Sequence, residues 1–329
     1  MCQLSCVYLG EMEAATKPAL ALPEAIDSEL NKALHRNGSL ADQPLAIRRF
    51  TARTGAGRPH EAMKLATASV LMAYDNAHSG VTEPISVERL CLLSNVALSG
   101  FRPSPRSSSN ISAAPQNGPT GFLEFAGAQP IIRIPPYVEF ERARVAVAHE
   151  LAHVLIHKKA DGYDEATIRL QSSPTEEALA EYGARLLLMP SQTTTAACDQ
   201  ENIAVWCVRR AQAARVTLHS AVARLGDPDM RNRRVRGAIL WRTKSSHCTE
   251  IHGQLTPYWH LCGDAFIPIG KCTARKNSVV ASAAQEPGRV ATSSTEQVHI
   301  GSLVGQFRVD ALSWGKEISR VVLSVFSVP

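Results

Sequence analysis

The chain has 329 residues, with 35 lysines and arginines against 30 aspartates and glutamates, so its formal charge is only +5. Its 45% hydrophobic and 20% charged residues are typical of a globular protein and argue against a disordered or membrane-embedded chain. The modest basic excess argues against a dedicated nucleic-acid-binding protein, which would carry a denser basic surface.

Residues 1–59 predict an irregular N-terminal segment without a targeting signal. Residues 1–10 are apolar, but no basic residue precedes them and Glu11 and Glu13 follow at once, unlike a secretory signal. No uncharged apolar run approaches the roughly 20 residues that a membrane span needs, and the 8 cysteines show no compact disulfide spacing. We therefore expect reduced thiols, a cytoplasmic location and no membrane partner.

Residues 60–190 are predicted to form a core of helices and a small sheet. Residues 60–79 have apolar side chains at helical spacing, and the helix predicted over residues 86–98 begins at Ser86, a favourable N-cap. Proline, serine, asparagine and glycine dominate residues 102–120, and this composition predicts a loop.

Two short strands are predicted after this loop, at residues 121–125 and 131–134. Pro135 and Pro136 end the second strand. Because proline cannot donate to a ladder of backbone hydrogen bonds, we expect the second strand to lie at an edge of its sheet. Such an edge could pair with an extended peptide chain.

Two strong helices follow. Residues 141–157 contain neither glycine nor proline and repeat apolar side chains at helical spacing, and residues 174–189 run from a proline at the start to the stop at Pro190. Residues 191–230 are predicted as a helical segment that breaks into two helices around residues 215–217, in a pattern like a helix-turn-helix.

Residues 235–329 change in character and predict a smaller C-terminal domain of the α+β or β-rich kind. Strand-like patterns, separated by polar stretches rich in Ser, Thr and Gly, occur at residues 238–242, 251–255, 290–292 and 318–326.

The first of the two strong helices carries a metal-binding pattern. His149, Glu150 and His153 form an H-E-x-x-H motif. Histidines at i and i+4 lie about 40° apart around a helix and one turn along it, so both imidazoles can reach one ion. Tetrahedral Zn²⁺ accepts neutral imidazole well, and a neighbouring carboxylate can take a proton from water. The pattern predicts about one zinc ion per chain, held by His149 and His153, with Glu150 as the catalytic base.

A catalytic zinc site usually has three protein ligands, so a third must come from elsewhere. His157 lies about 12 Å from His149 along the same helix, too far to share the ion, and we interpret it as structural or as a support for a ligand. The next helix offers Glu176, Glu177 and Glu181. A ligand at Glu177 would leave Glu181 one turn along, able to hydrogen-bond a ligating histidine. The alternative for these carboxylates is a solvated acidic helix face.

The two helices resemble the ImmA/IrrE family of metallopeptidases. The matching stretches read A-H-E-L-A-H-V-L-I-H and E-x-x-A-E-x-x-A-x-x-L-L-M-P. The resemblance implies that Glu177, which lies 13 residues before the closing proline, is the third metal ligand. Glu181 stands where the family has Asn or Asp, and the family's small-aromatic pair is shifted to Tyr182–Gly183. The resemblance covers about residues 80–226.

This resemblance implies a zincin-like fold, in which a small sheet packs on the active-site helix and a second helix supplies the glutamate. Several family members are cytoplasmic endopeptidases that cleave a helix-turn-helix repressor. For this chain it implies zinc-dependent hydrolysis of peptide bonds in a protein substrate, such as a transcriptional repressor of a stress-response or mobile-element circuit. The C-terminal domain lies outside the resemblance and is expected to sense a signal or recruit the substrate.

Two further groups of residues have alternative interpretations. The basic side chains of the helix-turn-helix-like segment, Arg209, Arg210, Arg215 and Arg224, could contact phosphates. Because the basic excess is modest, we favour a helical scaffold over DNA binding. A second zinc site could combine Cys248, His252, His260 and Cys262, but their spacing is not that of a tight zinc knuckle, and we interpret them as independent residues.

The alternative to an enzyme is a non-proteolytic regulatory module, stabilised by a metal ion, that binds DNA or a regulator. The two functions differ in their need for Glu150, because a purely structural zinc site does not require a base beside the ion.

Overall fold

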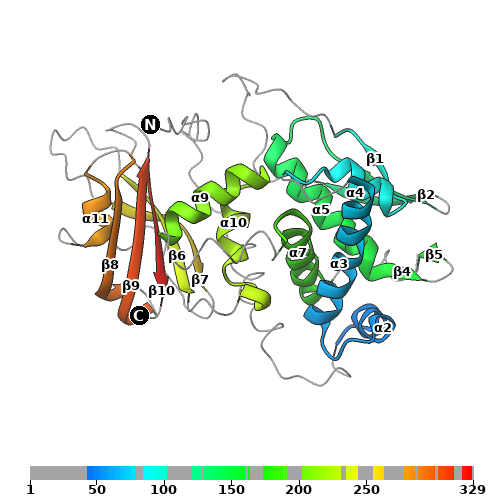
Figure 1. Ribbon diagram of the computed structural model, residues 1–329, viewed down its shortest axis with the longest axis horizontal. Coiled ribbons are helices and arrows are strands. Elements are labelled where there is room, and N and C mark those ends of the chain that lie inside the picture. The colour runs from blue at the N-terminus through cyan, green and yellow to red at the C-terminus, as the bar shows by residue number, and fades with distance from the viewer. Residues whose placement is uncertain are drawn as a thin grey trace. The chain divides into compact units, whose positions relative to one another are not determined.

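A computed structural model describes residues 43–78, 84–101, 121–126, 129–159, 162–163, 173–190, 202–230, 235–243, 255–262, 278–285, 288–300, 303–314 and 321–327 (Figure 1). They divide into two compact units. The helical unit comprises residues 19–193 and 211–224, and the sheet unit includes residues 194–210 and 225–329. The chain has the predicted α+β fold, and none of its described helices is both long and apolar enough to cross a membrane.

The helical unit is built mainly from helices. They are α2 (Leu45–Thr54), α3 (Pro59–His78), α4 (Val87–Leu93), α5 (Phe140–His157), α7 (Pro174–Leu188), the last residues of α9 (Ile203–Ala214) and α10 (Leu218–Arg224). Helix α7 packs along α5 and α3, and its apolar side chains share two buried cores with them. Leu151, Val154 and Leu187 are each fully buried in one of these cores. This packing fixes α5 and α7 side by side.

Two of the N-terminal predictions need correction. Residues 45–54 form α2, so the expectation of an irregular segment over residues 1–59 is wrong there. Helix α4 does begin after Ser86, whose side chain accepts a hydrogen bond from the backbone N–H of Arg89, but it ends at Leu93. Asn95 then has a φ of 58°, which stops the helix, and residues 97–99 form strand β1 in place of the last helical turn.

A three-stranded sheet lies in the same unit. Its strands are β1 (Ala97–Ser99), β2 (Phe122–Ala126) and β3 (Gln129–Arg133), in the order β1-β3-β2. Strand β3 runs parallel to β1 and antiparallel to β2, so it is the central strand, and the predicted edge position is wrong. Pro135 and Pro136 lie beyond the last paired residue and therefore cost no ladder bond, while Ile134 still donates its N–H to Ser99. A short pair, β4 (Lys158–Lys159) and β5 (Gly162–Tyr163), follows α5.

The turn between α9 and α10 is bound to α5 through a buried arginine. Arg144 donates hydrogen bonds to the carbonyl oxygens of Ala214 and Arg215 at 3.2 and 3.0 Å. Arg215, with a φ of 52°, places its guanidinium 4.1 Å from the ring centroid of Phe140. Arg224 is fully buried and donates to the carbonyl of Met189. The predicted break at residues 215–217 is therefore confirmed.

The sheet unit contains a five-stranded antiparallel sheet. Its strands are β6 (Val235–Thr243), β7 (Leu255–Cys262), β8 (Val290–Ile300), β9 (Leu303–Trp314) and β10 (Val321–Ser327), in the order β7-β6-β10-β9-β8. Helix α11 (Val279–Ala283) packs on β8, β9 and β10, and the 3₁₀ turn η2 (Pro228–Met230) precedes β6. The prediction of a β-rich C-terminal region is confirmed, but β9 was missed and β8 is much longer than expected. Most of the strand expected at residues 251–255 lies outside the described residues.

Candidate metal centre

Helix α5 presents both motif histidines to α7. His149 and His153 lie one turn apart, and their side chains are 21% and 9% exposed. The intervening Leu151 and Ala152 are fully buried, so packing on the other sides of the helix fixes its rotation. The amphipathic pattern of α5 therefore aims both imidazoles at one place.

Helix α7 supplies the carboxylates from its first turn. The hydroxyl of Ser173 accepts a hydrogen bond from the backbone N–H of Glu176, and Pro174 starts the helix. A serine cap followed by proline is a favourable helix start, and acidic residues are stabilised in the first turn by the helix dipole. The local sequence thus places Glu176 and Glu177 side by side at the N-terminal end of α7.

A glycine allows the two helices to approach closely. A Cβ atom added at Gly183 would lie 2.8 Å from the Cβ of Ala152 on α5 and 2.7 Å from the Sδ of Met63 on α3. No side chain larger than hydrogen fits this contact without a shift. The position of glycine after Tyr182, which departs from the family's usual pattern, therefore has a structural reason here.

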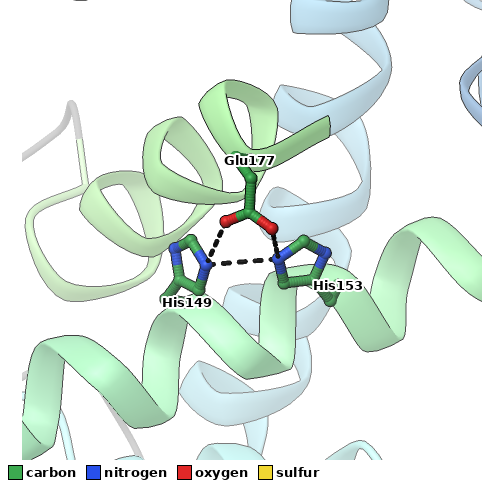
Figure 2. A group of neighbouring side chains, drawn as sticks. All are labelled: His149, His153 and Glu177. Carbon is green, nitrogen blue, oxygen red and sulfur yellow. Dashed lines mark hydrogen bonds and ion pairs between the residues drawn. The ribbon is translucent and has the colours of Figure 1, made fainter. Parts of the chain in front are cut away.

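Three predicted site residues converge between these helices (Figure 2). His149 Nε2 lies 3.1 Å from a carboxylate oxygen of Glu177 and 3.2 Å from His153 Nε2. His153 Nε2 lies 3.5 Å from the other carboxylate oxygen of Glu177. Together they form a group in which each residue offers one ligand atom to a common ion.

This donor set fits a zinc ion. Ligand atoms about 2.0–2.2 Å from a tetrahedral zinc ion lie about 3.3–3.6 Å from one another. The separations here, 3.2 Å between the two Nε2 atoms and 3.1 and 3.5 Å from Nε2 to carboxylate oxygens, are close to this range. Two imidazoles and one carboxylate form a usual ligand set for catalytic zinc and leave a fourth position for water. The half-exposed carboxylate of Glu177, 31% accessible, keeps one side of the group open to solvent.

Glu150, the expected base, lies next to the start of β2. It is partly buried, and a Cβ atom added at Gly121 would lie 3.4 Å from its Cγ. Because Gly121 has no side chain, the chain that leads into β2 passes close to this carboxylate. The structure therefore brings a sheet strand, the motif glutamate and the histidines into one region.

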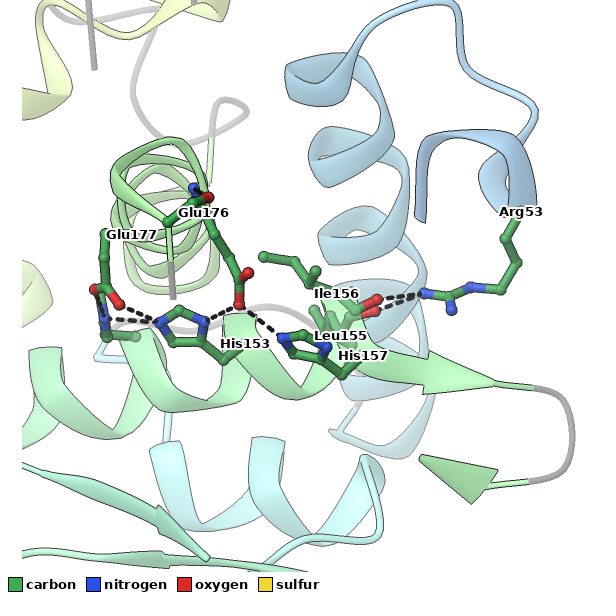
Figure 3. Close-up of polar contacts among 9 residues, drawn as sticks. Arg53, His153, Leu155, Ile156, His157, Glu176 and Glu177 are labelled. Atoms are coloured by element: carbon green, nitrogen blue, oxygen red, sulfur yellow. Dashed lines mark hydrogen bonds and ion pairs between the residues drawn. The ribbon is translucent and has the colours of Figure 1, made fainter. Parts of the chain in front are cut away.

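Glu176, which the sequence analysis did not assign, contacts two histidines of α5 (Figure 3). Its Oε1 lies 3.1 Å from His153 Nδ1 and 2.6 Å from His157 Nε2. Burial alone would raise the pKa of Glu176. The two hydrogen bonds outweigh that effect and lower the pKa to about 2. Burial likewise lowers the pKa of His153, but its hydrogen bonds with Glu176 and Glu177 raise it to about 10. The carboxylate is therefore ionised near neutral pH.

Two residues were predicted to support the metal ligands, His157 and Glu181, and they have different partners in the structure. His157 is buried and bonds Glu176, whereas Glu181 pairs with Arg185 on its own helix at 3.6 Å. Glu176 thus occupies the place beside a motif histidine that we expected for Glu181. The sequence does show two histidines one turn apart, at 153 and 157, but it does not show which residue of α7 contacts them.

The other candidate groups are only partly described. Cys248 and His252 lie outside the described residues, and of His260 and Cys262 only the backbone is described, in β7. The second zinc site therefore stays a prediction. Among the four arginines of the helix-turn-helix-like segment, Arg210 and Arg224 are buried, which argues against their binding phosphates.

Comparison with known proteins identified one family that matches part of the chain. Residues 111–225 match the model of a peptidase family that is described as the IrrE N-terminal-like domain. A solved structure described as a Mycobacterium tuberculosis transcriptional regulator is 15% identical, with a TM-score of 0.42 and coverage of 87% of this chain and 82% of that chain. A comparison with curated proteins gave no match. The match confirms the predicted resemblance to the ImmA/IrrE family over residues 111–225 and points to a metallopeptidase family, which implies a metal ion.

Proposed function

We propose that this chain, which carries an IrrE N-terminal-like domain over residues 111–225, is a zinc-dependent endopeptidase. The observation that carries the proposal is the convergence of His149, His153 and Glu177, with ligand atoms 3.1–3.5 Å apart, one residue from Glu150. His149 and His153 would hold Zn²⁺ through their Nε2 atoms, and Glu177 through its carboxylate.

Glu150, which directly follows His149 in the motif, is proposed as the general base. When bound, Zn²⁺ lowers the pKa of water and polarises a carbonyl group. The Glu150 carboxylate then accepts the proton of the attacking water and passes it to the leaving amine. The role of His149, His153 and Glu177 would be to hold the zinc ion, and none of them needs to transfer a proton. The group that stabilises the oxyanion is not assigned.

Strand β2 is the best place for an extended substrate. Strand β3, which the sequence predicted as the edge for an extended peptide, is paired on both sides and cannot accept another strand. Within the described residues β2 is an edge strand, and Gly121, which directly precedes it, lies beside Glu150. An extended peptide that pairs with the free edge of β2 would run toward the proposed base. A protein substrate presented as an exposed loop, such as a segment of a repressor, suits this geometry.

The experiment compares the full-length chain with Glu150→Gln and with Glu61→Gln, a matched change at an exposed glutamate of α3. Each zinc-loaded protein is incubated with a peptide library, and new N-termini are identified by mass spectrometry. We expect wild type and Glu61→Gln to cleave, and Glu150→Gln to keep zinc but lose at least 100-fold in rate, because an amide cannot accept the proton. Equal cleavage by Glu150→Gln would contradict the role of Glu150 as the base, and no cleavage by zinc-loaded wild type would favour the non-proteolytic regulatory module.

A further inference from the structure

Glu176 bridges two imidazoles that belong to successive turns of α5. The same oxygen, Oε1, lies 3.1 Å from His153 Nδ1 and 2.6 Å from His157 Nε2 (Figure 3). The side chains of all three are at most 9% exposed. Little solvent can therefore replace either hydrogen bond.

This bridge determines which ring nitrogen of His153 carries hydrogen. In a hydrogen bond between an imidazole nitrogen and a carboxylate oxygen the ring N–H is the donor, so His153 Nδ1 donates to Glu176. A histidine that binds an ion is neutral, and with its remaining hydrogen on Nδ1 it has its lone pair on Nε2. That nitrogen faces His149 and Glu177, at 3.2 and 3.5 Å. Glu176 thus selects the form of His153 that can bind an ion between α5 and α7.

His157 and its helix end are themselves held in place. Arg53 of α2 donates to the carbonyl oxygens of Leu155 and Ile156, at 2.7 and 3.4 Å (Figure 3). These carbonyls lie in the last turn of α5, which has no further helical N–H groups to bond them. The hydroxyl of Ser173 fixes the backbone of Glu176 from the other side. The contacts therefore run continuously from α2 through His157 and Glu176 to His153.

We propose that Glu176 is a positioning residue that orients His153 for zinc binding, and that His157 holds Glu176 in place for this task. The proposal rests on the proposed function only for the identity of the ion. Carboxylates that bond the outer nitrogen of a ligating histidine typically contribute 10- to 100-fold to metal affinity. Glu181, one turn further along α7, pairs with Arg185 of its own helix.

The same residues have a second interpretation. His153, His157 and Glu176 also form a buried group whose atoms could surround an ion of their own. If both groups held an ion at once, His153 would have to bind through both nitrogens and lose both of its ring hydrogens. The short contact of 2.6 Å between His157 Nε2 and Glu176 is already a good hydrogen bond, so we favour positioning, and the experiment below separates the two.

The test measures zinc affinity by competition with a chelator for full-length wild type, Glu176→Gln, His157→Gln and the exposed control Glu61→Gln. We expect Glu176→Gln to weaken zinc binding by about 10- to 100-fold, His157→Gln by a smaller factor, and Glu61→Gln by less than about threefold. Thermal melting of the zinc-free proteins checks that each variant folds. If Glu176→Gln does not fold, His157→Gln still tests the bridge, and unchanged affinity there would overturn the proposal.

A spectroscopic readout distinguishes positioning from a general loss of packing. In zinc-loaded wild type, proton NMR should show a slowly exchanging imidazole N–H from His153 Nδ1, because it is buried and bonded to a carboxylate. The signal should exchange faster in Glu176→Gln, because an amide oxygen is a weaker acceptor than a carboxylate, and stay unchanged in Glu61→Gln. A signal and affinity unchanged in Glu176→Gln would contradict the proposal, as would two zinc ions per wild-type chain with one lost in that variant.

Failure of this inference can be told from failure of the proposed function. If Glu176→Gln weakens zinc binding but Glu150→Gln still cleaves like wild type, the positioning role stands and the peptidase mechanism falls. If Glu150→Gln is inactive while Glu176→Gln binds zinc normally, the reverse holds. Wild-type protein that takes up no zinc would overturn both.

Discussion

Glu176 and Glu177 are adjacent in sequence, but their side chains contact different atoms of the site. Successive residues of a helix point about 100° apart, so Glu177 faces the two Nε2 atoms while Glu176 reaches between His153 and His157. The motif and the resemblance predicted His149, His153 and Glu177 as a group. They could not predict Glu176, because its contacts depend on the rotation of α7 against α5, which long-range packing determines.

The described cysteines illustrate how burial controls reactivity. Cys91 and Cys207 are free and buried. Burial, assisted by the nearby Glu88, raises the pKa of Cys91 to about 12, so its thiol stays neutral over the physiological range. Since the thiolate is the reactive form, we expect Cys91 to resist alkylation by iodoacetamide at pH 8 in the native protein and to react in urea. Mass spectrometry of the peptide that contains Cys91 measures this, and rapid native labelling would show that α4 opens or is packed differently.

At the scale of elements, strong local patterns predicted the helices well and the strands less well. Helices α3, α5 and α7 follow the predicted ranges within two residues, because each has regular apolar spacing and a clear start or stop. Strand β3 was predicted to lie at an edge because Pro135 and Pro136 follow it. The sequence gives no sign that β1 pairs with it. Strand β9 was missed because Gly305, Gln306 and Asp310 interrupt its apolar pattern; Asp310 is buried through contacts that only the folded sheet provides.

The contact between α5 and α7 at Gly183 should be sensitive to one added methyl group. In Gly183→Ala the new Cβ would lie 2.8 Å from Ala152 Cβ, which cannot move without moving α5. We expect a loss of about 1–3 kcal/mol in the free energy of unfolding, with weaker zinc binding because the ligands lie on both helices. Urea unfolding and zinc titration measure the two effects. Gly57→Ala is the control, since its Cβ would meet only Glu61 at 3.6 Å; similar losses in both variants would contradict the account.

At the scale of the whole molecule, the two compact units have separate cores. The division falls within α9, so the first part of that helix belongs to the sheet unit. There Asn202 caps the helix by accepting from the N–H of Val205 and also donates to Asp310 of β9. We propose that the sheet unit senses a signal or recruits the substrate, because it contributes none of the proposed zinc ligands.

Asp310 allows the independence of the units to be tested. It is fully buried and accepts hydrogen bonds from Asn202, Thr292 and Arg308. Asp310→Ala should cost the sheet unit about 1–3 kcal/mol because the hydrogen bonds to this buried carboxylate are lost. We expect faster hydrogen exchange in β8, β9 and β10, with exchange in α5 and α7 and the zinc affinity unchanged. Faster exchange in α5 to the same extent would show that the units do not fold separately.

The central claim is that His149, His153 and Glu177 hold a single zinc ion, and metal analysis of the purified protein tests it most directly. Wild type, purified without chelators and supplied with zinc, should hold about one ion per chain. Glu177→Ala should retain much less after dialysis, whereas the exposed control Glu61→Ala should match wild type. Zinc-free wild-type protein that takes up no ion on titration, or a Glu177→Ala variant that binds zinc as tightly as wild type, would contradict the account.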